Sequence, residues 1–404
     1  MKRMIRDHFS FVLIALGSGT IFLCNILFKT LLSETDYGEY SILITFIATV
    51  FNLGLLGLDK VLMRVTTIKN KRIYLDKKFP WAIGLTILFV CVIGTYIFNK
   101  QFFVGSNSFI KILIVALSAV LSMISYNFYR LKSEFVKAQM ISNIWKFGLL
   151  LFAFVFYLWQ FHEFTLLFNA VFVLCTVILI TTVILLFKTS FSYGNTIENK
   201  DFIKFWIGFG VSISVLIGIT FFDRYYIKEI FGAATFGNYF YLANIFLFPF
   251  HLLQNYVGFK KLVFFKENFS RTILLKQTQN LFFQSILLSI VLCVVAYLAN
   301  FLQLIEVDFK SEIWLILSFL FLGMIKVFFG LFESALSARV HIRLINQTNL
   351  VSLIIVGLVL ILTISFIETV LDVAILTCAM WLCLVLVYLG ASLKLNQENL
   401  KEAQ

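Results

Sequence analysis

The stretch ETDYGEYSIL, residues 34–43, is a polar turn between two apolar runs, and a degraded copy of it, ATFGNYFYLA, occupies residues 233–242. At a constant offset of 199 residues the copies share an aromatic-glycine-polar-tyrosine motif, a following leucine and a preceding lysine, namely Tyr37-Gly38-Glu39-Tyr40 with Phe236-Gly237-Asn238-Tyr239, Leu43 with Leu242, and Lys29 with Lys228. One corner that recurs at a fixed spacing indicates two structural repeats. The competing explanation is that each glycine simply caps a helix.

The composition identifies the environment of both repeats. Hydrophobic residues make up 61% of the 404 residues, charged residues 13%, and the mean hydropathy is +0.96. Water-soluble domains do not have this composition. Apolar runs long enough to cross about 30 Å of hydrocarbon follow one another along the chain. They predict an all-α polytopic membrane protein with about 12 transmembrane helices, at residues 9–32, 38–58, 79–98, 109–129, 141–160, 164–187, 207–231, 237–258, 277–302, 312–335, 349–367 and 370–390.

The N-terminal segment has the basic head and apolar body of a signal peptide, but no small-residue cleavage site follows and the apolar run continues to Leu32. We therefore expect an uncleaved first helix. The six cysteines all lie inside predicted spans and lack metal-ligand spacing, so we interpret them as small hydrophobic side chains. Neither a metal nor a cofactor is expected.

The distribution of basic residues predicts the orientation. If the N-terminus is cytoplasmic, the inner segments contain 25 of the 33 lysines and arginines, whereas the outer loops contain two, Lys100 and Lys310. This asymmetry places both termini in the cytoplasm. The net charge of +12 follows mainly from this bias, with anionic membrane lipids as its natural partners, and requires no nucleic acid.

The repeat implies an architecture. Its two corners join helices one and two and helices seven and eight, and six crossings return the chain to the same side of the membrane. Two parallel six-helix lobes are therefore expected, one over residues 1–190 and one over residues 191–404, related by an axis along the membrane normal.

The repeat also extends helix seven. Apolarity alone would end this helix at Phe222, before DRYYIKEIFG, but the alignment places Asp223, Arg224 and Lys228 opposite residues 24, 25 and 29 of helix one. These charges are then expected in the outer half of the membrane. Charged side chains at such depth are costly and generally face a protein-lined or aqueous interior.

Polar side chains at helical spacing lead to the same interpretation. They form stripes that predict a central polar cavity between the lobes, with helix packing through small polar residues as the alternative. The stripes are Ser18, Asn25 and Lys29; Ser41, Thr45, Thr49 and Asn52; Ser118, Ser122, Ser125 and Tyr129; Asn244, His251 and Asn255; and Lys326 with Glu333.

Four segments resemble a known family. The segments LLSETDYGEYSILITF with LGLDKVLMR, FFDRYYIKEIFGAATFGNYFYLANIF, and SALSARVHIRLINQTN are similar to bacterial exporters that flip lipid-linked O-antigen or capsule repeat units. These exporters form the polysaccharide-transporter branch of the multidrug/oligosaccharidyl-lipid/polysaccharide exporter superfamily. The turn SFIETVLDVA, before the last helix, departs from the family because it lacks the usual glycines, which leaves the ends of helices eleven and twelve open.

The resemblance implies a substrate and a location. A flippase of this family would move a polyprenyl-diphosphate-linked oligosaccharide across a bacterial inner membrane by alternating access, with other polysaccharide assembly proteins as further partners. Arginine and lysine would then offset the desolvation of the diphosphate, while amides and hydroxyls would meet the sugar. The expected substrate-binding residues are Arg224, Lys29, Lys228, Asn25, Asp223, Asn52, Asn244, Asn255 and Lys326.

Two further features belong to the cytoplasmic side and to helix eight. Asp59, Lys60 and Arg64 close helix two and, by the resemblance, would line an inner entrance, whereas the favoured alternative is that they are positive-inside anchors. Pro249 lies in the middle of helix eight, where loss of a backbone hydrogen bond permits a hinge or a fixed kink.

Two other functions remain open at this point. A membrane polymerase or ligase of lipid-linked oligosaccharides would need a large outer loop, whereas the longest predicted one is short, residues 99–108, and no catalytic constellation is recognisable. A drug/cation antiporter of the same superfamily would need embedded carboxylates, whereas the embedded charges here are mostly positive.

Overall fold

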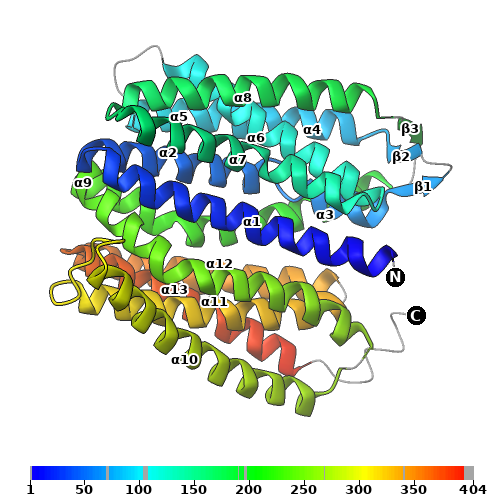
Figure 1. Ribbon diagram of the computed structural model, residues 1–404. Helices are drawn as coiled ribbons and strands as arrows, with labels where there is room; N and C mark the ends of the chain where they lie inside the picture. Colours follow the sequence, from blue (N-terminus) through cyan, green and yellow to red (C-terminus); the bar gives the residue numbers. More distant parts are fainter. Residues whose placement is uncertain are drawn as a thin grey trace. The chain divides into compact units, whose positions relative to one another are not determined.

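The computed structural model describes residues 2–69, 72–102, 108–189, 191–194, 198–267, 269–339 and 342–394. Helices form most of this part of the chain (Figure 1). They are α1 (Lys2–Leu31), α2 (Glu34–Leu53), α3 (Leu58–Val65), α4 (Phe79–Ile87), the π-helix η1 (Leu88–Ile93), α5 (Gly94–Phe102), α6 (Ser108–Leu131), α7 (Phe135–Trp159), α8 (Phe164–Phe187), α9 (Asn199–Glu267), α10 (Arg271–Phe301), α11 (Ile313–Arg339), α12 (Ile342–Thr363), the 3-10 helix η2 (Ile364–Phe366) and α13 (Val370–Leu393).

The prediction of an all-helical polytopic membrane protein is confirmed. Among the described residues, 11 helices are long and apolar enough to cross a membrane. One of them, α9, contains a single non-helical residue, Gly232, at which two helices meet. Each arm of α9 is long enough for its own crossing, so the described helices allow the twelve crossings that the apolar runs predicted.

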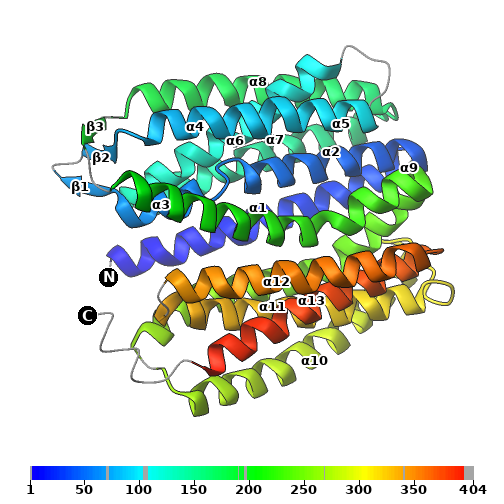
Figure 2. The same cartoon turned by 180° about the vertical axis from the view of Figure 1, so that it is seen from behind.

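The chain forms two compact units, Met1–Gly237 and Asn238–Gln404. In the first unit, α6 packs on α7 and α8, α1 packs on α7, and α2 packs on α6 (Figures 1 and 2). In the second unit, α11 packs on α10 and α13, and α13 packs on α12. The arm of α9 that precedes Gly232 belongs to the first unit, whereas the expected lobe boundary lay at residues 190 and 191. The two six-helix lobes thus remain a prediction from the repeat.

The repeated corner is visible in the backbone. The side chain of Ser33 caps α2 by accepting a hydrogen bond from the backbone N–H of Asp36 at 3.1 Å. Gly232 follows Ser33 by the 199 residues of the repeat, and its φ of 85° lies in the region that favours glycine. The chain therefore turns from one helix into the next at equivalent positions of the two copies.

The glycines of the two corners have a steric cause. A Cβ atom on Gly38 would lie 1.9 Å from the backbone oxygen of Ala233, and one on Gly237 would lie 3.1 Å from the backbone nitrogen of Gly38. The start of α2 and the second corner therefore meet backbone against backbone. A plain helix-capping role does not explain this contact.

A substitution at this contact is expected to destabilise the first unit. Gly38→Ala must displace the backbone at Ala233, and overpacking of this kind costs about 1–3 kcal/mol. Gly84→Ala is the matched control, because a Cβ on Gly84 of α4 meets nothing within 4 Å. Thermal unfolding in detergent should show a lower midpoint for Gly38→Ala only. Equal midpoints would contradict the close approach.

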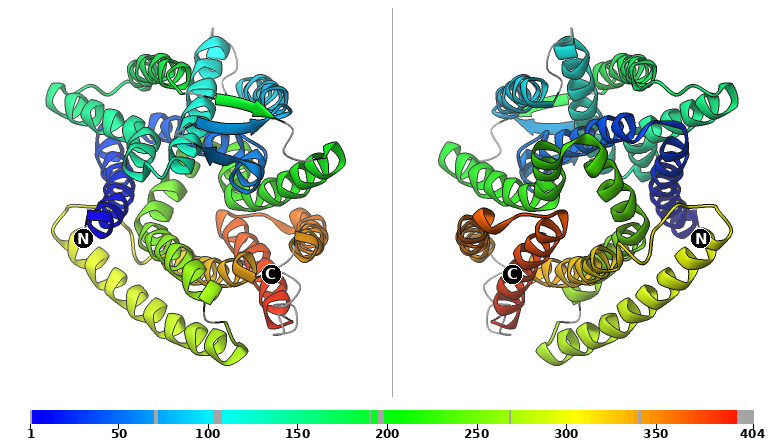
Figure 3. Two further views of the ribbon diagram at one scale, coloured as in Figure 1. Left: turned by 90° about the vertical axis from the view of Figure 1, so that its right-hand side faces the viewer. Right: turned by 90° about the vertical axis from the view of Figure 1, so that its left-hand side faces the viewer.

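Three short strands form a sheet that the sequence analysis did not predict. The strands are β1 (Thr67–Lys69), β2 (Arg72–Asp76) and β3 (Phe191–Gly194); β1 pairs antiparallel and β3 parallel with β2. Figure 3 shows the sheet across the ends of the first unit's helices. Asp76 is fully buried and forms an ion pair with Lys78 at 3.3 Å. Through the pairing of β2 with β3, the predicted inner loop after helix two contacts the segment that leads into α9.

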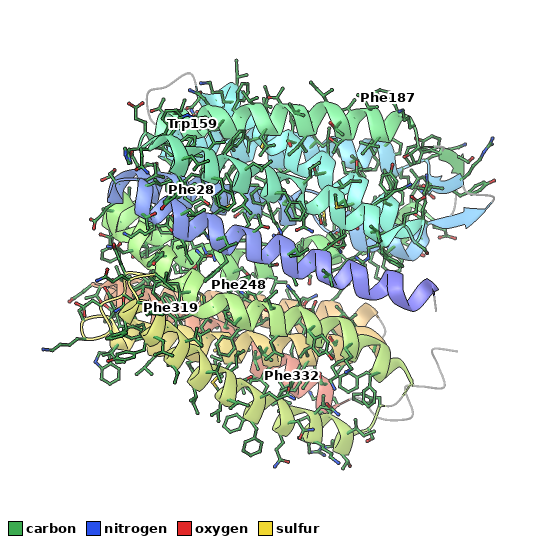
Figure 4. All side chains as sticks on the ribbon, viewed as in Figure 1. Phe28, Trp159, Phe187, Phe248, Phe319 and Phe332 are labelled. Carbon is green, nitrogen blue, oxygen red and sulfur yellow. The ribbon has the colours of Figure 1, made fainter. Side chains whose placement is uncertain are left out.

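The periphery of the first unit carries large apolar side chains, whereas its interior is packed with aromatic rings. Phe28 is fully buried and contacts the rings of Tyr40 and Phe156. Trp159 and Phe187 are 64% and 87% exposed (Figure 4). Exposed apolar side chains on long helices fit a hydrocarbon environment, since water would disfavour them.

The structure defines the ends of the last two helices around SFIETVLDVA, which the sequence left open. Helix α12 ends at Thr363, and α13 begins after Thr369, whose side chain forms a capping box with Asp372. A threonine and an aspartate therefore start this helix. Both ends lie close to the predicted spans.

The predicted orientation can be tested with reporters. Fusions after Lys401, within residues 66–76 and within residues 262–272 are expected to report the cytoplasm, while a fusion within residues 104–107 is expected to report the outside. Paired alkaline phosphatase and fluorescent-protein fusions give opposite signals on the two sides. An external signal at residues 262–272 would contradict both the twelve crossings and the parallel repeat.

Candidate functional site

The first arm of α9 carries the charged segment that the repeat extended. The helix is continuous through residues 223–228, so the prediction that helix seven includes Asp223, Arg224 and Lys228 is confirmed. Asp223 is 4% exposed, and the guanidinium carbon of Arg224 lies 5.3 Å from the centre of the Phe221 ring. An aromatic face stabilises a cation that has left water. Whether these residues contact a substrate remains a prediction.

Lys228 has a partner that the sequence analysis did not assign. Its ammonium forms an ion pair with Glu39, in the repeated corner at the start of α2. The lysine side chain is 10% exposed and the glutamate side chain is 22% exposed, so the pair is largely buried. A buried lysine whose charge is already balanced does not need a substrate to explain it.

Tyr225 fixes the next turn of the same arm. Its hydroxyl donates a hydrogen bond to Oγ1 of Thr49 on α2 at 2.9 Å. Its ring contacts Phe98 and Phe102 of α5, with ring centres 6.4 Å and 5.8 Å away. Residues 225 and 228 therefore fasten the arm to α2 and α5 of the first unit.

A cavity of about 430 Å³ opens among α2, α5 and this arm of α9. It is lined by Thr49, Leu53, Gln101, Ser214, Ile217, Gly218, Phe221, Phe222, Tyr225, Tyr226 and Glu229. Aromatic rings form much of the wall, and hydroxyl, amide and carboxylate groups supply a few polar contacts. Binding sites for small molecules and for parts of lipids commonly have this mixture.

Helix one contributes two of the predicted residues. Asn25 is 1% exposed; its Oδ1 accepts a hydrogen bond from the Tyr40 hydroxyl at 2.8 Å, while its Nδ2 has no hydrogen-bond partner among the described residues. Nζ of Lys29 lies 5.6 Å from the centre of the Tyr37 ring. An unsatisfied buried donor is costly, which makes Asn25 a candidate for an oxygen-bearing ligand.

The polar stripe of helix two is largely satisfied by its own backbone. Ser41, Thr45 and Thr49 each donate to the carbonyl four residues earlier, at 2.7 to 2.8 Å. Asn52 does the same toward Ala48 at 2.7 Å and is exposed. On α6 the serine stripe is buried, as the packing alternative expects. Among these residues Thr49 lines the cavity.

The remaining predicted substrate residues belong to the second unit. Asn244 donates to the carbonyl of Phe240 at 2.7 Å, and Asn255 is exposed. Lys326 is 3% exposed, with its ammonium 4.9 Å from the centre of the Trp381 ring. Pro249 lies inside the second arm of α9. The non-helical residue of α9 is Gly232, which separates the two arms. The hinge at Pro249 stays a prediction.

The expected inner entrance lies on a separate short helix. Helix α2 ends at Leu53, a turn with Leu56 and Gly57 at positive φ follows, and α3 then carries Asp59 and Lys60. Nζ of Lys60 lies 5.8 Å from the centre of the Phe209 ring of α9. The side chain of Arg64 lies outside the described residues. An entrance role for these three residues stays a prediction.

Three residues of this site were not predicted from the sequence, namely Glu39, Tyr225 and Glu229. Glu39 was recognised as part of the repeat, and its charge opposite that of Lys228 was the available signal. Tyr225 and Glu229 lie one and five residues after Arg224 on the charged segment. Nothing in the local sequence indicates that they share a cavity with Thr49 and Gln101.

Comparisons with known proteins support the fold. No protein-family model matches the chain, and no curated protein matches it. The structure is similar to a solved structure named "Lipid II flippase MurJ, inward closed conformation", with a TM-score of 0.63 and 15% sequence identity over 99% of this chain and 89% of that one. Because the identity is low, this likeness shows the arrangement of helices that the two chains have in common.

Proposed function

We propose that this protein is a flippase that moves a polyprenyl-diphosphate-linked oligosaccharide repeat unit from the cytoplasmic to the outer leaflet by alternating access. It would act in a bacterial inner membrane, with both termini in the cytoplasm and with other polysaccharide assembly proteins as partners. The observation that carries the proposal is the charged arm of α9, in which Asp223, Arg224 and Lys228 lie on a membrane-spanning helix of a transporter-like fold.

The chemistry of such a substrate gives these charges a purpose. Its tail stays in lipid, so only the sugar and the diphosphate need a path through the protein. Arg224 offers the planar, bidentate donor that suits a phosphate group, and Lys29 offers a point charge, whereas Lys228 is already paired with Glu39. The free amide donor of Asn25 is suited to a sugar or phosphate oxygen.

The direction of transport follows from electrostatics. With the cell interior negative, outward movement of an anion gains about 2.3 kcal/mol per charge per 100 mV. The membrane potential alone therefore favours export of a diphosphate head group, and the proposal requires no bound cofactor.

The fold likeness supports the general class of this proposal. The solved neighbour is named as a flippase of lipid II, and a chain with a similar helix arrangement is a reasonable candidate for another lipid-linked substrate. The choice of an O-antigen or capsule repeat unit rests on the resemblance of the segments at residues 31–46, 56–64, 221–246 and 334–349.

The cavity favours one second candidate, a drug/cation antiporter. Aromatic walls from Phe221, Phe222 and Tyr226 with the exposed carboxylate of Glu229 are suited to an amphipathic cation. The cations on the same arm favour the flippase instead. A polymerase or ligase is not favoured by any described residue cluster.

Deletion of the gene separates these functions. A flippase deletion should cause a lipid-linked oligosaccharide to accumulate on the cytoplasmic face. Extraction and mass spectrometry identify the lipid, and a membrane-impermeant label added to sealed inverted vesicles shows that it lies on this face. Loss of surface glycan without this accumulation would contradict the proposal and favour a polymerase or ligase. Normal glycan with increased sensitivity to cationic dyes would favour the antiporter.

A further inference from the structure

Lys146, in the middle of α7, was not among the predicted site residues. Lys146 is the twelfth of the 25 residues of α7, so it lies about 16 Å along the helix axis from Phe135. This position is near the centre of a membrane-spanning helix. An ionisable residue at such depth is rare and generally serves a function.

Among the described residues, the surroundings of Lys146 supply a hydrogen bond but no ion pair. Its ammonium donates to Oδ1 of Asn143 at 2.8 Å and lies 5.9 Å from the centre of the Trp145 ring. Both partners are neutral, and no carboxylate among the described residues forms an ion pair with it. The residue is half-buried.

Asn143 is held in place by polar neighbours on the same helix. Its Nδ2 donates to the carbonyl oxygen of Gln139 at 2.9 Å and to Oγ of Ser142 at 3.2 Å. This leaves Oδ1 directed at the ammonium. The four side chains form a polar ladder, defined as Gln139, Ser142, Asn143 and Lys146, that rises from the start of α7 to its middle.

Helix α1 packs closely against Asn143 of this ladder. Asn143 is 3% exposed, and a Cβ on Gly17 of α1 would lie 2.1 Å from its Oδ1. The packing of α1 on α7 therefore needs Gly17 and Asn143, whereas it does not need a positive charge. A methionine would fill the same volume without the cost of an uncompensated cation.

We propose that Lys146 is a second contact for the diphosphate of the substrate, deeper in the membrane than Arg224, with Asn143 as its positioning residue. The inference rests on the proposed function, because it assumes an anionic lipid-linked head group. A cation with only neutral partners gains most from an anion that arrives without its water. The ladder below it, Gln139 and Ser142, offers neutral polar groups along the way from the cytoplasmic side.

The test uses the full-length protein in nanodiscs of phosphatidylethanolamine and phosphatidylglycerol, with geranylgeranyl diphosphate as the probe and geranylgeraniol as the uncharged reference. Lys146→Met is expected to weaken binding of the diphosphate about tenfold and to leave binding of the alcohol unchanged. Lys146→Arg should stay within about threefold of the wild type, since it keeps the charge.

Lys111→Met is the matched control. Lys111 also lies in a membrane-spanning helix and also donates to a single amide, Oδ1 of Asn169 at 2.7 Å, but it stands in the first turn of α6. The variant Lys111→Met should bind the diphosphate as tightly as the wild type does. If Lys146→Met does not fold, Lys146→Gln replaces it, because glutamine keeps a donor for Asn143 without the charge.

The outcomes separate this inference from the proposed function. If the wild type prefers the diphosphate to the alcohol but Lys146→Met and Lys146→Gln bind it equally well, the role of Lys146 is wrong and the proposed function stands. If the wild type does not prefer the diphosphate, the proposed function fails first. If excess phosphatidylglycerol removes the difference between Lys146→Met and the wild type, Lys146 binds ordinary anionic lipid and the assignment to the substrate is wrong.

Discussion

Arg224→Ala is expected to lower export of the lipid-linked oligosaccharide by about ten- to a hundredfold at normal protein abundance. Loss of one charge-assisted phosphate contact costs about 1.5–3 kcal/mol, which corresponds to this range. Arg224→Lys should recover part of the export, because the charge returns without the bidentate geometry. Flipping of a fluorescent polyprenyl-diphosphate sugar in proteoliposomes, normalised to the amount of reconstituted protein, measures the effect.

Arg271→Ala is the control for a general effect of arginine loss. Arg271 is exposed in the first turn of α10, so its removal should leave both export and abundance close to those of the wild type.

A structural role for Arg224 is the competing explanation. Asp223 precedes it and is 4% exposed, so the arginine could serve to balance a buried carboxylate. Adjacent residues of a helix point in different directions, which weakens this explanation. The double variant Asp223→Ala/Arg224→Ala distinguishes the two. Recovery of wild-type export in the double variant would show that the pair is structural, whereas a persistent defect at normal abundance supports the phosphate contact.

The second large effect is expected from the ion pair of Lys228 and Glu39. Glu39→Lys places two cations together where the lysine side chain is only 10% exposed. After allowance for partial exposure, the free energy of unfolding should fall by about 1–3 kcal/mol. Lys228→Glu should do the same with two carboxylates. Unfolding midpoints and abundance in the membrane report both changes.

The charge-swapped variant Glu39→Lys/Lys228→Glu then decides the role of the lysine. Oppositely charged groups meet again, so stability should return to near the wild-type value. If Lys228 also contacts the diphosphate, export should remain about tenfold below that of the wild type, because an anion now occupies its position on α9. Full recovery of export with stability would mean that the pair only fastens α9 to α2.

A surface pair provides the control for this swap. Lys137 and Glu134 form an ion pair at 2.6 Å, but their side chains are 68% and 38% exposed. Exposed pairs contribute little, so the single changes and the swap at this site should leave stability and export almost unaltered.

The internal repeat predicted the extent of helix seven better than hydropathy alone. Apolarity ends helix seven at Phe222, whereas the alignment of the second corner with the first extends it through Arg224, and α9 follows the alignment. The same alignment places the break at Gly232, 199 residues after Ser33. Two copies of a pattern thus constrain a helix better than the hydropathy of either copy alone.

The sequence by itself determined the long apolar helices and predicted twelve membrane crossings, because each helix depends on the apolar length and composition of one local segment. It also determined the equivalent corners, since glycine is needed where backbones meet. Only the tertiary structure decided that Lys228 pairs with Glu39, that Asn143 orients Lys146 against Gly17, and that β2 binds β3 across more than a hundred residues. These contacts join segments that are distant in the chain, and local periodicity carries no information about which distant side chains meet, because packing of whole helices decides it.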